Sequence, residues 1–426
     1  MLYFEKGSPD STLSDEELTE GLYSAFDKIG AMNKVLIIPP DMTRKQSKAG
    51  FLTTEASKYL GDKLKAILPA LGTHSPMSAS QIEEMYPGVD KNKFQIHNWR
   101  KNLSKIGKVP KDFIYDITDG ALNFSWPIEI NEELLNPKWD AILSIGQVVP
   151  HEVTGFSNHS KNIFVGVGGA EAIHKSHYIG AICGTEKIMG RADTPVRKVF
   201  NFACENYIKN IPIIYILTVI GADSSGTPVT KGLFIGDGLE CFYKAAELSR
   251  KVNITILEKP IKKAVVYLNP KQYKSTWLGN KAIYRTRMAI EDNGELIIIA
   301  PGLSQFGEDP EIDKLIQKYG YCGTKQILKQ TKNNNDLEKN LCAAAHLIHG
   351  SSEDRFSITY AAGKLSDEKM KKVGYDTVKL EEVLSFYNID NLKNGFNIDR
   401  NGKEFYYINN PALGLWAQKS KFQGVE

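Results

Sequence analysis

Short apolar runs alternate with amphipathic stretches along the first 260 residues. Ser14-Asp15-Glu16-Glu17 is a capping box in front of an amphipathic stretch, which predicts a helix to about residue 29. The apolar run Val35-Leu36-Ile37-Ile38 ends at Pro39-Pro40 and predicts a buried strand. By the same reasoning we expect further helices over 53–68 and after residues 78, 193 and 238, and further strands over 141–145 and 211–220.

A second alternating series begins after Leu257-Glu258-Lys259-Pro260. It predicts strands over 264–268, 295–300 and 356–360, and helices over 277–290, within 310–348 and over 380–387. Alternating strands and helices are typical of α/β proteins, and 426 residues exceed one hydrophobic core. We therefore expect two α/β domains with an active-site cleft between them. The expected parts are 1–260, an N-terminal catalytic and cofactor-binding domain; 261–400, a C-terminal α/β domain; and 401–426, a segment packing back on the first domain.

Polar loops follow the predicted strands and helices of the first domain. Asp41, His74 and His151 all fall on such loops. In open α/β sheets ligands bind beyond the carboxyl ends of the strands. The pattern therefore predicts that these three side chains lie on the ligand-binding edge.

Composition excludes several classes of protein. Hydrophobic residues are 42% and charged residues 24% of the chain, as in ordinary globular proteins, and the net charge is only +3. No dense basic stripe of the kind that binds nucleic acid or an anionic membrane is present. The N-terminus lacks the apolar core of a signal peptide and no run approaches membrane-spanning length, so we expect a cytoplasmic protein. Five widely spaced cysteines without a CxxC pair argue against a disulfide framework.

Local patterns give weaker signals. His174-Lys175-Ser176-His177 has the spacing of a metal-binding pair, so a zinc hydrolase using His174 and His177 is one alternative. A catalytic zinc normally takes three protein ligands, and no HExxH is present. The glycines at Val165-Gly166-Val167-Gly168-Gly169 do not fit GxGxxG and favour a turn. Asp41-Met42-Thr43-Arg44 offers a carboxylate, a hydroxyl and a guanidinium, which suit either an ion-paired turn or an anionic ligand.

Several separated motifs, taken together, resemble the lactate racemase family. The segments 41–44, 72–77 and 150–157 resemble its DxTR, GTHxPM and PHxxxGFS motifs, and Lys161, His177 and Lys281 follow at the expected intervals. The resemblance spans much of the chain in the right order. It implies an isomerase, a 2-hydroxy acid racemase or epimerase, acting on a small molecule and dependent on cofactor-maturation enzymes, without nucleic acid or a membrane as partner.

The resemblance also implies a cofactor, a nickel-pincer nucleotide (Ni(II) pyridinium-3,5-bisthiocarboxylic acid mononucleotide). Lys161 would be its covalent attachment point and His177 its metal ligand, since imidazole suits Ni(II) and the pincer fills the other positions. Asp41, Thr43 and Arg44 would contact the cofactor. The implied reaction is reversible hydride transfer from the substrate carbon to the pincer.

The remaining implied roles concern the substrate. His74 and His151 would be the acid/base pair, because imidazole serves equally as acid and base near neutral pH. Arg44 and Lys281 would hold the substrate carboxylate.

Two positions depart from the lactate-specific pattern. Asn158-His159 replaces the two glycines expected after GFS, and Leu278 stands where a glutamine is expected. A lactate-like or larger 2-hydroxy acid, such as an aldonate, is therefore the expected substrate, and His159 or Asn158 could bind extra hydroxyls. Besides the zinc hydrolase, a non-catalytic metallocofactor-binding protein remains an alternative. The sequence assigns no role to His97, His174, His346 or His349.

Overall fold

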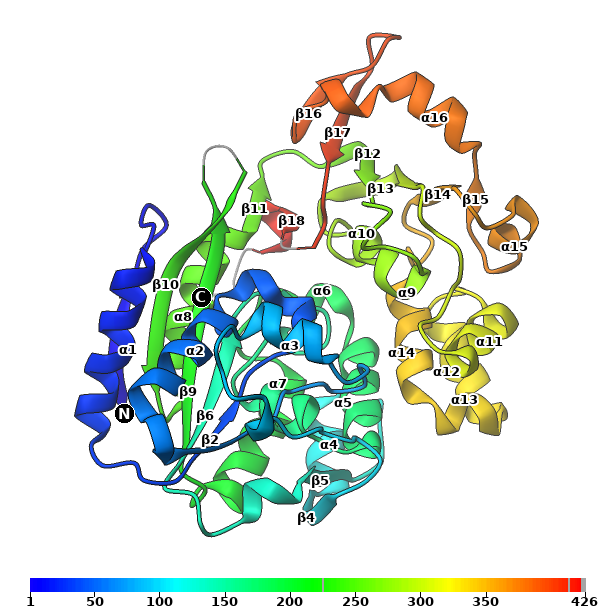
Figure 1. Cartoon of the computed structure of the whole chain (residues 1–426). Coiled ribbons are helices and arrows are strands. Elements are labelled where there is room, and N and C mark those ends of the chain that lie inside the picture. Colours follow the sequence, from blue (N-terminus) through cyan, green and yellow to red (C-terminus); the bar gives the residue numbers. More distant parts are fainter. Residues whose placement is uncertain (224–225, 413, 423–426) are drawn as a thin grey trace. The chain divides into compact units, whose positions relative to one another are not determined.

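The computed structural model describes residues 1–223, 226–412 and 414–422, which fall into two compact units (Figure 1). Unit 1 consists of Met1–Ser176 and Met189–Asn253, and unit 2 of His177–Ile188 and the described residues from Ile254 onward. Each unit is built on a six-stranded sheet with helices packed against it. The predicted α/β class is confirmed.

Unit 1 holds the chain's first ten strands. These are β1 (Leu2–Gly7), β2 (Val35–Ile38), β3 (Leu64–Ile67), β4 (Leu103–Val109), β5 (Trp126–Asn131), β6 (Ala141–Gln147), β7 (Pro150–His151), β8 (Gly155–Phe156), β9 (Ile213–Ala222) and β10 (Pro228–Gly236). Its helices are α1 (Asp15–Ile29), α2 (Ala49–Leu60), α3 (Ala79–Met85), α4 (Lys111–Ile117), α7 (Pro195–Ala203) and α8 (Leu239–Asn253), with short 3-10 or π turns including η1 (Met42–Ser47) and η5 (Asn162–Gly166). Helix α5 (Ala170–Cys183) begins in unit 1 and ends in unit 2.

The main sheet of unit 1 has the order β1-β10-β9-β6-β2-β3. Strands β9, β6, β2 and β3 run parallel, and β10 runs antiparallel to both of its neighbours, β9 and β1. Alternate residues of a strand face opposite sides of the sheet. Ile214 and Ile216 of β9 therefore join the core under α1 and α2, whereas Tyr215 faces the other side of the sheet, where its ring lies against His159. Both faces are covered, which explains why the strands are apolar throughout.

Unit 2 is built on a sheet of order β15-β14-β13-β12-β17-β16, parallel except for the β16–β17 pair. Its strands are β11 (Ile254–Leu257), β12 (Ile261–Tyr267), β13 (Ile290–Ala300), β14 (Ser357–Ala362), β15 (Asp376–Thr377), β16 (Gly395–Ile398), β17 (Glu404–Ile408) and β18 (Leu415–Gln418). Its helices are α6 (Thr185–Ile188), α9 (Thr276–Gly279), α10 (Lys281–Tyr284), α11 (Pro310–Tyr319), α12 (Thr324–Asn333), α13 (Asn335–Lys339), α14 (Leu341–His349), α15 (Asp367–Lys372) and α16 (Leu380–Tyr387).

Two predicted helices are wrong in part. The helix expected over 53–68 ends at Leu60, because Gly61 has φ +53°, and Leu64–Ile67 is the strand β3. A short apolar run does not distinguish a buried strand from a helix by periodicity. The helix expected over 277–290 is two single turns interrupted at Asn280, whose side chain accepts hydrogen bonds from Tyr360 and Tyr375. The other expected elements form within a few residues of their predicted ends.

The C-terminal segment contributes two strands to unit 2. Strand β17 pairs with β12, and β18 pairs with β11. The division into 1–260, 261–400 and 401–426 stays a prediction, and residues 413 and 423–426 of its last part lie outside the described residues. None of the helices in the described part of the chain has the length and apolar character needed to cross a membrane.

Candidate functional site

The candidate site lies at the carboxyl ends of three adjacent parallel strands of unit 1, β6, β2 and β3. Asp41 follows β2 and caps η1, His74 follows β3, and His151 follows β6 in the short hairpin β7–β8. The expectation that these three residues occupy loops beyond the strands is therefore confirmed.

Asp41 and His74 form a hydrogen-bonded pair. The distance from His74 Nδ1 to Asp41 Oδ2 is 2.6 Å, and Asp41 is only 4% exposed, whereas the His74 side chain is 50% exposed. Burial raises the pKa of Asp41, but hydrogen bonds from His74 and Thr43 and the positive charge of Arg44 outweigh it and lower that pKa below 3.8. Asp41 is therefore a buried carboxylate that fixes one nitrogen of a half-exposed imidazole.

Thr43 and Arg44 support this carboxylate. Both the backbone N–H and the hydroxyl of Thr43 donate to Asp41 Oδ1. The backbone N–H of Arg44 donates to the backbone carbonyl of Asp41. The motif Asp41-Met42-Thr43-Arg44 thus forms a closed turn that presents a guanidinium beside a fixed carboxylate.

His151 is held differently from His74. Its Nδ1 accepts a hydrogen bond from the Val153 N–H at 3.1 Å, and the Glu152 carboxylate lies 3.8 Å from the same nitrogen. An Nδ1 that accepts a hydrogen bond carries no proton, so a neutral His151 holds its proton on Nε2. Both histidines therefore direct Nδ1 toward the protein's own polar groups, but Nδ1 of His74 lies against a carboxylate that can only accept, whereas Nδ1 of His151 accepts a backbone N–H.

Lys161 is half-buried and comes immediately before the π turn η5. Its pKa falls from 10.5 to about 8, first because of burial and then because of Arg44 and Arg197, while Glu152 and Asp41 act in the opposite direction. A larger fraction of its amine is therefore neutral near pH 7 than in an exposed lysine. Only the neutral amine is a nucleophile.

Asn162 ties this segment to the sheet, and sequence reasoning missed it. Its amide donates to the Ile38 carbonyl at the end of β2 and to the Ser144 hydroxyl of β6. The Gly72 N–H donates to the Gly166 carbonyl, which joins the loop of His74 to η5. No motif singles out Asn162; its position next to Lys161 was the only available signal.

The other two predicted site residues, His177 and Lys281, belong to unit 2. His177 lies on α5, and the segment that follows it is fixed in unit 2 by the Thr185–His349 hydrogen bond, 2.8 Å, and by ion pairs from Glu186 to Arg287 and Arg355. Lys281 opens α10 with its Nζ 5.9 Å from the centre of the Tyr273 ring.

The remaining histidines have structural contacts. His97 Nε2 is 3.1 Å from the Gly168 carbonyl, and burial lowers its pKa to about 4. His174 packs near Trp99, and His346 stacks on Trp277. His159 is 3% exposed and lies 3.7 Å from Tyr215, ring centre to ring centre. This stacking gives no support to a role in binding substrate hydroxyls.

Among the described residues, no group of three or more His, Cys, Asp or Glu side chains could hold a metal ion. A zinc site built from His174 and His177 would need a third protein ligand of this kind. The described residues therefore offer the zinc hydrolase alternative no support.

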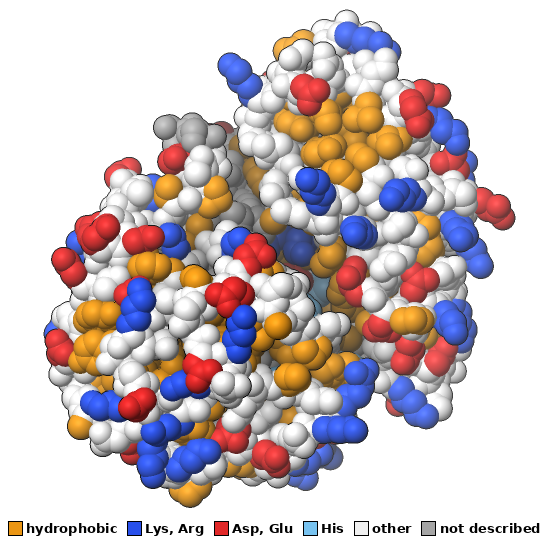
Figure 2. All heavy atoms as spheres, in the orientation of Figure 1, with side chains coloured by type: hydrophobic (Ala, Val, Ile, Leu, Met, Phe, Trp, Pro, Cys, Tyr) orange, Lys and Arg blue, Asp and Glu red, His pale blue; other side chains and the backbone are white. Residues whose placement is uncertain are grey.

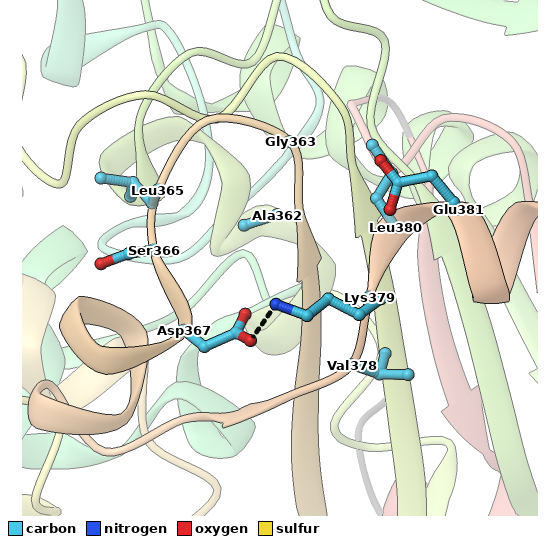
Figure 3. Close-up of a pocket in the computed structure, with 9 residues that line it drawn as sticks. All are labelled: Ala362, Gly363, Leu365, Ser366, Asp367, Val378, Lys379, Leu380 and Glu381. Atoms are coloured by element: carbon cyan, nitrogen blue, oxygen red, sulfur yellow. Dashed lines mark hydrogen bonds and ion pairs between the residues drawn. The ribbon is translucent and has the colours of Figure 1, made fainter.

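A separate hollow of about 260 Å³ lies in unit 2 beyond the carboxyl end of β14 (Figure 3). An ion pair of 2.6 Å joins Asp367 to Lys379 across it. Its lining residues are Ala362, Gly363, Leu365, Ser366, Asp367, Val378, Lys379, Leu380 and Glu381. None of the predicted site residues is among them. On the face drawn in Figure 2, basic and acidic side chains intermingle, unlike the dense basic stripe of a nucleic-acid-binding surface.

Comparisons with known proteins point to one family. Residues 23–190 match the family model of the lactate racemase N-terminal domain. A crystal structure of a protein from Thermotoga maritima is similar with a TM-score of 0.80 and 24% identity, over 96% of this chain and 99% of that chain. The lactate racemase apoprotein from Thermoanaerobacterium thermosaccharolyticum is similar with a TM-score of 0.71 and 16% identity, over 97% of this chain and 94% of that chain.

A search among curated protein sequences finds no significant match. At these identities the two solved structures show a shared fold alone, and the family model matches residues 23–190. The matched segment contains Asp41, Thr43, Arg44, His74, His151, Lys161 and His177. The match over residues 23–190 and the shared fold support a relationship to the lactate racemase family.

Proposed function

We propose that this protein is a 2-hydroxy acid racemase or epimerase that uses a nickel-pincer nucleotide attached to Lys161. The observation that carries the proposal is the hydrogen-bonded Asp41–His74 pair within electrostatic reach of an amine whose pKa is about 8. An oriented imidazole can move a proton, and a partly neutral lysine can be covalently attached to a cofactor.

The chain's own groups fit this cofactor. A metal held by protein side chains alone needs several donors close together, and the described residues contain no such group. A metal held mainly by an organic pincer needs one further donor, which His177 would supply. Lys161 would hold the organic part, and Asp41, Thr43 and Arg44 would line its polar side. When bound, the cofactor supplies an acceptor for the hydride on carbon 2 of the substrate.

His74 would take the hydroxyl proton of one enantiomer. Its Nδ1–H donates to Asp41, so Nε2 of the neutral ring has a lone pair available for the proton. The charged ring is then stabilised by the Asp41 carboxylate 2.6 Å away, as in other catalytic His–Asp pairs.

His151 would serve the other enantiomer, and for this it must be able to carry two protons. In the geometry described above its Nδ1 accepts from the Val153 N–H, which is compatible only with the neutral ring. When charged, His151 would exchange this contact for the Glu152 carboxylate, 3.8 Å away. The proposal thus requires the neutral ring to turn from the Val153 N–H and hold its proton on Nδ1 toward Glu152, which leaves Nε2 able to take the substrate proton.

Arg44 and Lys281 would hold the substrate carboxylate, with the planar Arg44 guanidinium giving the better-defined orientation. The proposed substrate is a lactate-like or larger 2-hydroxy acid, an aldonate among them. His159 is buried against Tyr215, so any selectivity for extra hydroxyls would come from other residues.

The experiment is a racemisation assay in heavy water on protein produced together with cofactor-maturation enzymes. We expect inversion of at least one chiral 2-hydroxy acid in a panel from lactate to aldonates, with the hydrogen on carbon 2 retained. The His74→Gln variant should lose activity, whereas Lys45→Gln should not, because Lys45 is exposed and its ion-pair partner Glu84 is exposed as well.

Each other outcome selects an alternative. Deuterium at carbon 2 would indicate proton abstraction from carbon and contradict hydride transfer. Loaded cofactor without turnover of any acid would favour the non-catalytic cofactor-binding protein. Bound zinc with ester or amide hydrolysis would favour the hydrolase.

A further inference from the structure

Arg197 of α7 is a buried cation without a carboxylate partner among the described residues. It is 0% exposed, and no ion pair to Asp or Glu forms within the described ranges. Burial lowers its pKa to about 10. Placing an unpaired charge in a protein interior costs several kcal/mol, on the order of the effective penalty for one buried ion. A neutral side chain would serve packing alone at lower cost.

The guanidinium of Arg197 binds the loop that leads directly into Lys161. It donates to the Phe156 carbonyl at 2.7 Å, to the Asn158 carbonyl at 3.3 Å and to the Ser160 hydroxyl at 2.9 Å. Its Cζ lies 4.2 Å from the centre of the Phe242 ring, and its Nε has no hydrogen-bond partner among the described residues. One side chain thus fixes three alternate residues of the segment 156–160.

This segment needs external support because its backbone is strained. Asn158 has φ +63° and His159 φ +55°, which place two successive non-glycine residues in the left-handed region. A Cβ added at Gly146 of β6 would come within 2.0 Å of the Asn158 amide nitrogen. Only glycine at this position therefore leaves room for the Asn158 side chain. These contacts define the loop at the two positions where the sequence departs from the pair of glycines expected in lactate-specific relatives.

The charge of Arg197 also acts on Lys161. The charged groups that influence the Lys161 amine are Arg44 from η1, Glu152 from the β7–β8 hairpin, Arg197 from α7 and Asp41 at the start of η1. The two carboxylates favour the protonated amine, and the two guanidinium groups oppose it. Arg197 is the only one of the four that also holds the backbone next to Lys161.

We propose that Arg197 is a positioning residue for Lys161, holding the 156–160 loop in its strained conformation and favouring the neutral, nucleophilic amine by its unpaired positive charge. The proposal rests on the proposed role of Lys161 as the attachment point of the cofactor. It predicts two separable effects: the conformation depends on the fork of the guanidinium, and the amine reactivity depends on the charge.

The test measures Lys161 in the cofactor-free protein. The rate of acetylation by acetic anhydride is followed at Lys161 from pH 6 to 11 by peptide mass spectrometry, and hydrogen exchange is followed over 156–161. In the wild type we expect the reactivity midpoint near pH 8. In Arg197→Met we expect a higher midpoint, acetylation at pH 7 slowed about two- to tenfold, and faster exchange confined to this loop, since one pKa unit is tenfold in neutral amine.

Two further variants separate the effects. Arg197→Lys keeps a charge but loses the fork, so exchange should rise while the midpoint stays within a few tenths of a pH unit. Lys198→Met removes the neighbouring positive charge on α7, which is exposed and lies 3.6 Å from Asp193, and should change neither readout. If Arg197→Met does not fold, Arg197→Lys alone decides: unchanged exchange over 156–161 overturns the proposal.

An unchanged midpoint and unchanged loop exchange in folded Arg197→Met would equally overturn it. The measurement needs no cofactor, so its failure is distinguishable from failure of the proposed function. If matured protein carried its cofactor elsewhere, the effect of Arg197 on Lys161 could still be observed, and the proposed function alone would be wrong.

Discussion

Replacing Lys161 by methionine should stabilise the cofactor-free protein at neutral pH. The substitution keeps an unbranched side chain, one heavy atom shorter, and removes its charge. In the native state the pKa of Lys161 is about 8, compared with 10.5 in an exposed lysine. Each pKa unit corresponds to about 1.4 kcal/mol, so the protonated amine costs the native state about 3 kcal/mol. This value is an upper bound, because Lys161 keeps some contact with solvent.

The sign of the pH dependence follows from which state binds the proton. Below pH 8 both states are protonated and the full cost is present. Between pH 8 and 10.5 the unfolded chain holds a proton that the native state has lost, so the free energy of unfolding rises with pH. Above 10.5 both states are neutral and the cost is gone. The advantage of Lys161→Met should therefore be largest below pH 8 and vanish near pH 10.5.

Urea unfolding at pH 7, 8, 9 and 10 measures this difference. Because the two units can unfold separately, hydrogen-exchange protection of β6 should accompany it to report on unit 1. Lys198→Met, an exposed lysine on α7, is the matched control and should change stability by less than about 1 kcal/mol. A Lys161→Met protein no more stable than the wild type at pH 7, or a difference constant from pH 8 to 10, would refute the reasoning.

The remaining predictions concern the proposed reaction. Asp41→Asn should slow racemisation about 10- to 150-fold with little change in KM, because a hydrogen bond to a charged group contributes about 1.5–3 kcal/mol; an unchanged kcat would exclude Asp41 as the partner of His74. The lowered pKa of Asp41 stabilises the native state above about pH 4 and this contribution is lost as pH falls through the native pKa, so urea unfolding should show a weaker acid destabilisation in Asp41→Asn. His177→Ala should lower the nickel content of matured protein in elemental analysis, whereas His174→Ala should not; equal loss in both would contradict His177 as the specific ligand. Arg44→Lys should raise KM by about tenfold or more in steady-state kinetics, because an ammonium cannot form the planar fork, and an unchanged KM would remove Arg44 from the carboxylate site.

The elements that position the site were predictable because they follow from local chemistry. The capping boxes at Ser14 and Ser78 and the apolar run at 35–38 each predict their element, and the structure has them at those residues. The loops of Asp41 and His151 follow from the ends of predicted strands, whereas the loop of His74 was expected after a helix. Strand β3 was missed because an apolar run of four residues directly after a helix has no distinguishing period.

Long-range contacts account for what the sequence could not predict about the site. The Asp41–His74 pair joins residues 33 positions apart, and Arg197 reaches loop residues 37 to 41 positions earlier. Neither of these separations along the chain corresponds to a local sequence pattern. Only the topology of the parallel sheet, which brings the ends of β2 and β3 together, places Asp41 beside His74.

The intact mass and metal content of protein produced together with the maturation enzymes decide whether Lys161 carries a nickel cofactor. We expect about one nickel per chain, a mass increase that peptide mapping assigns to Lys161, and loss of both in Lys161→Met. Fully matured protein with an unmodified Lys161, or with nickel retained in Lys161→Met, would contradict this attachment.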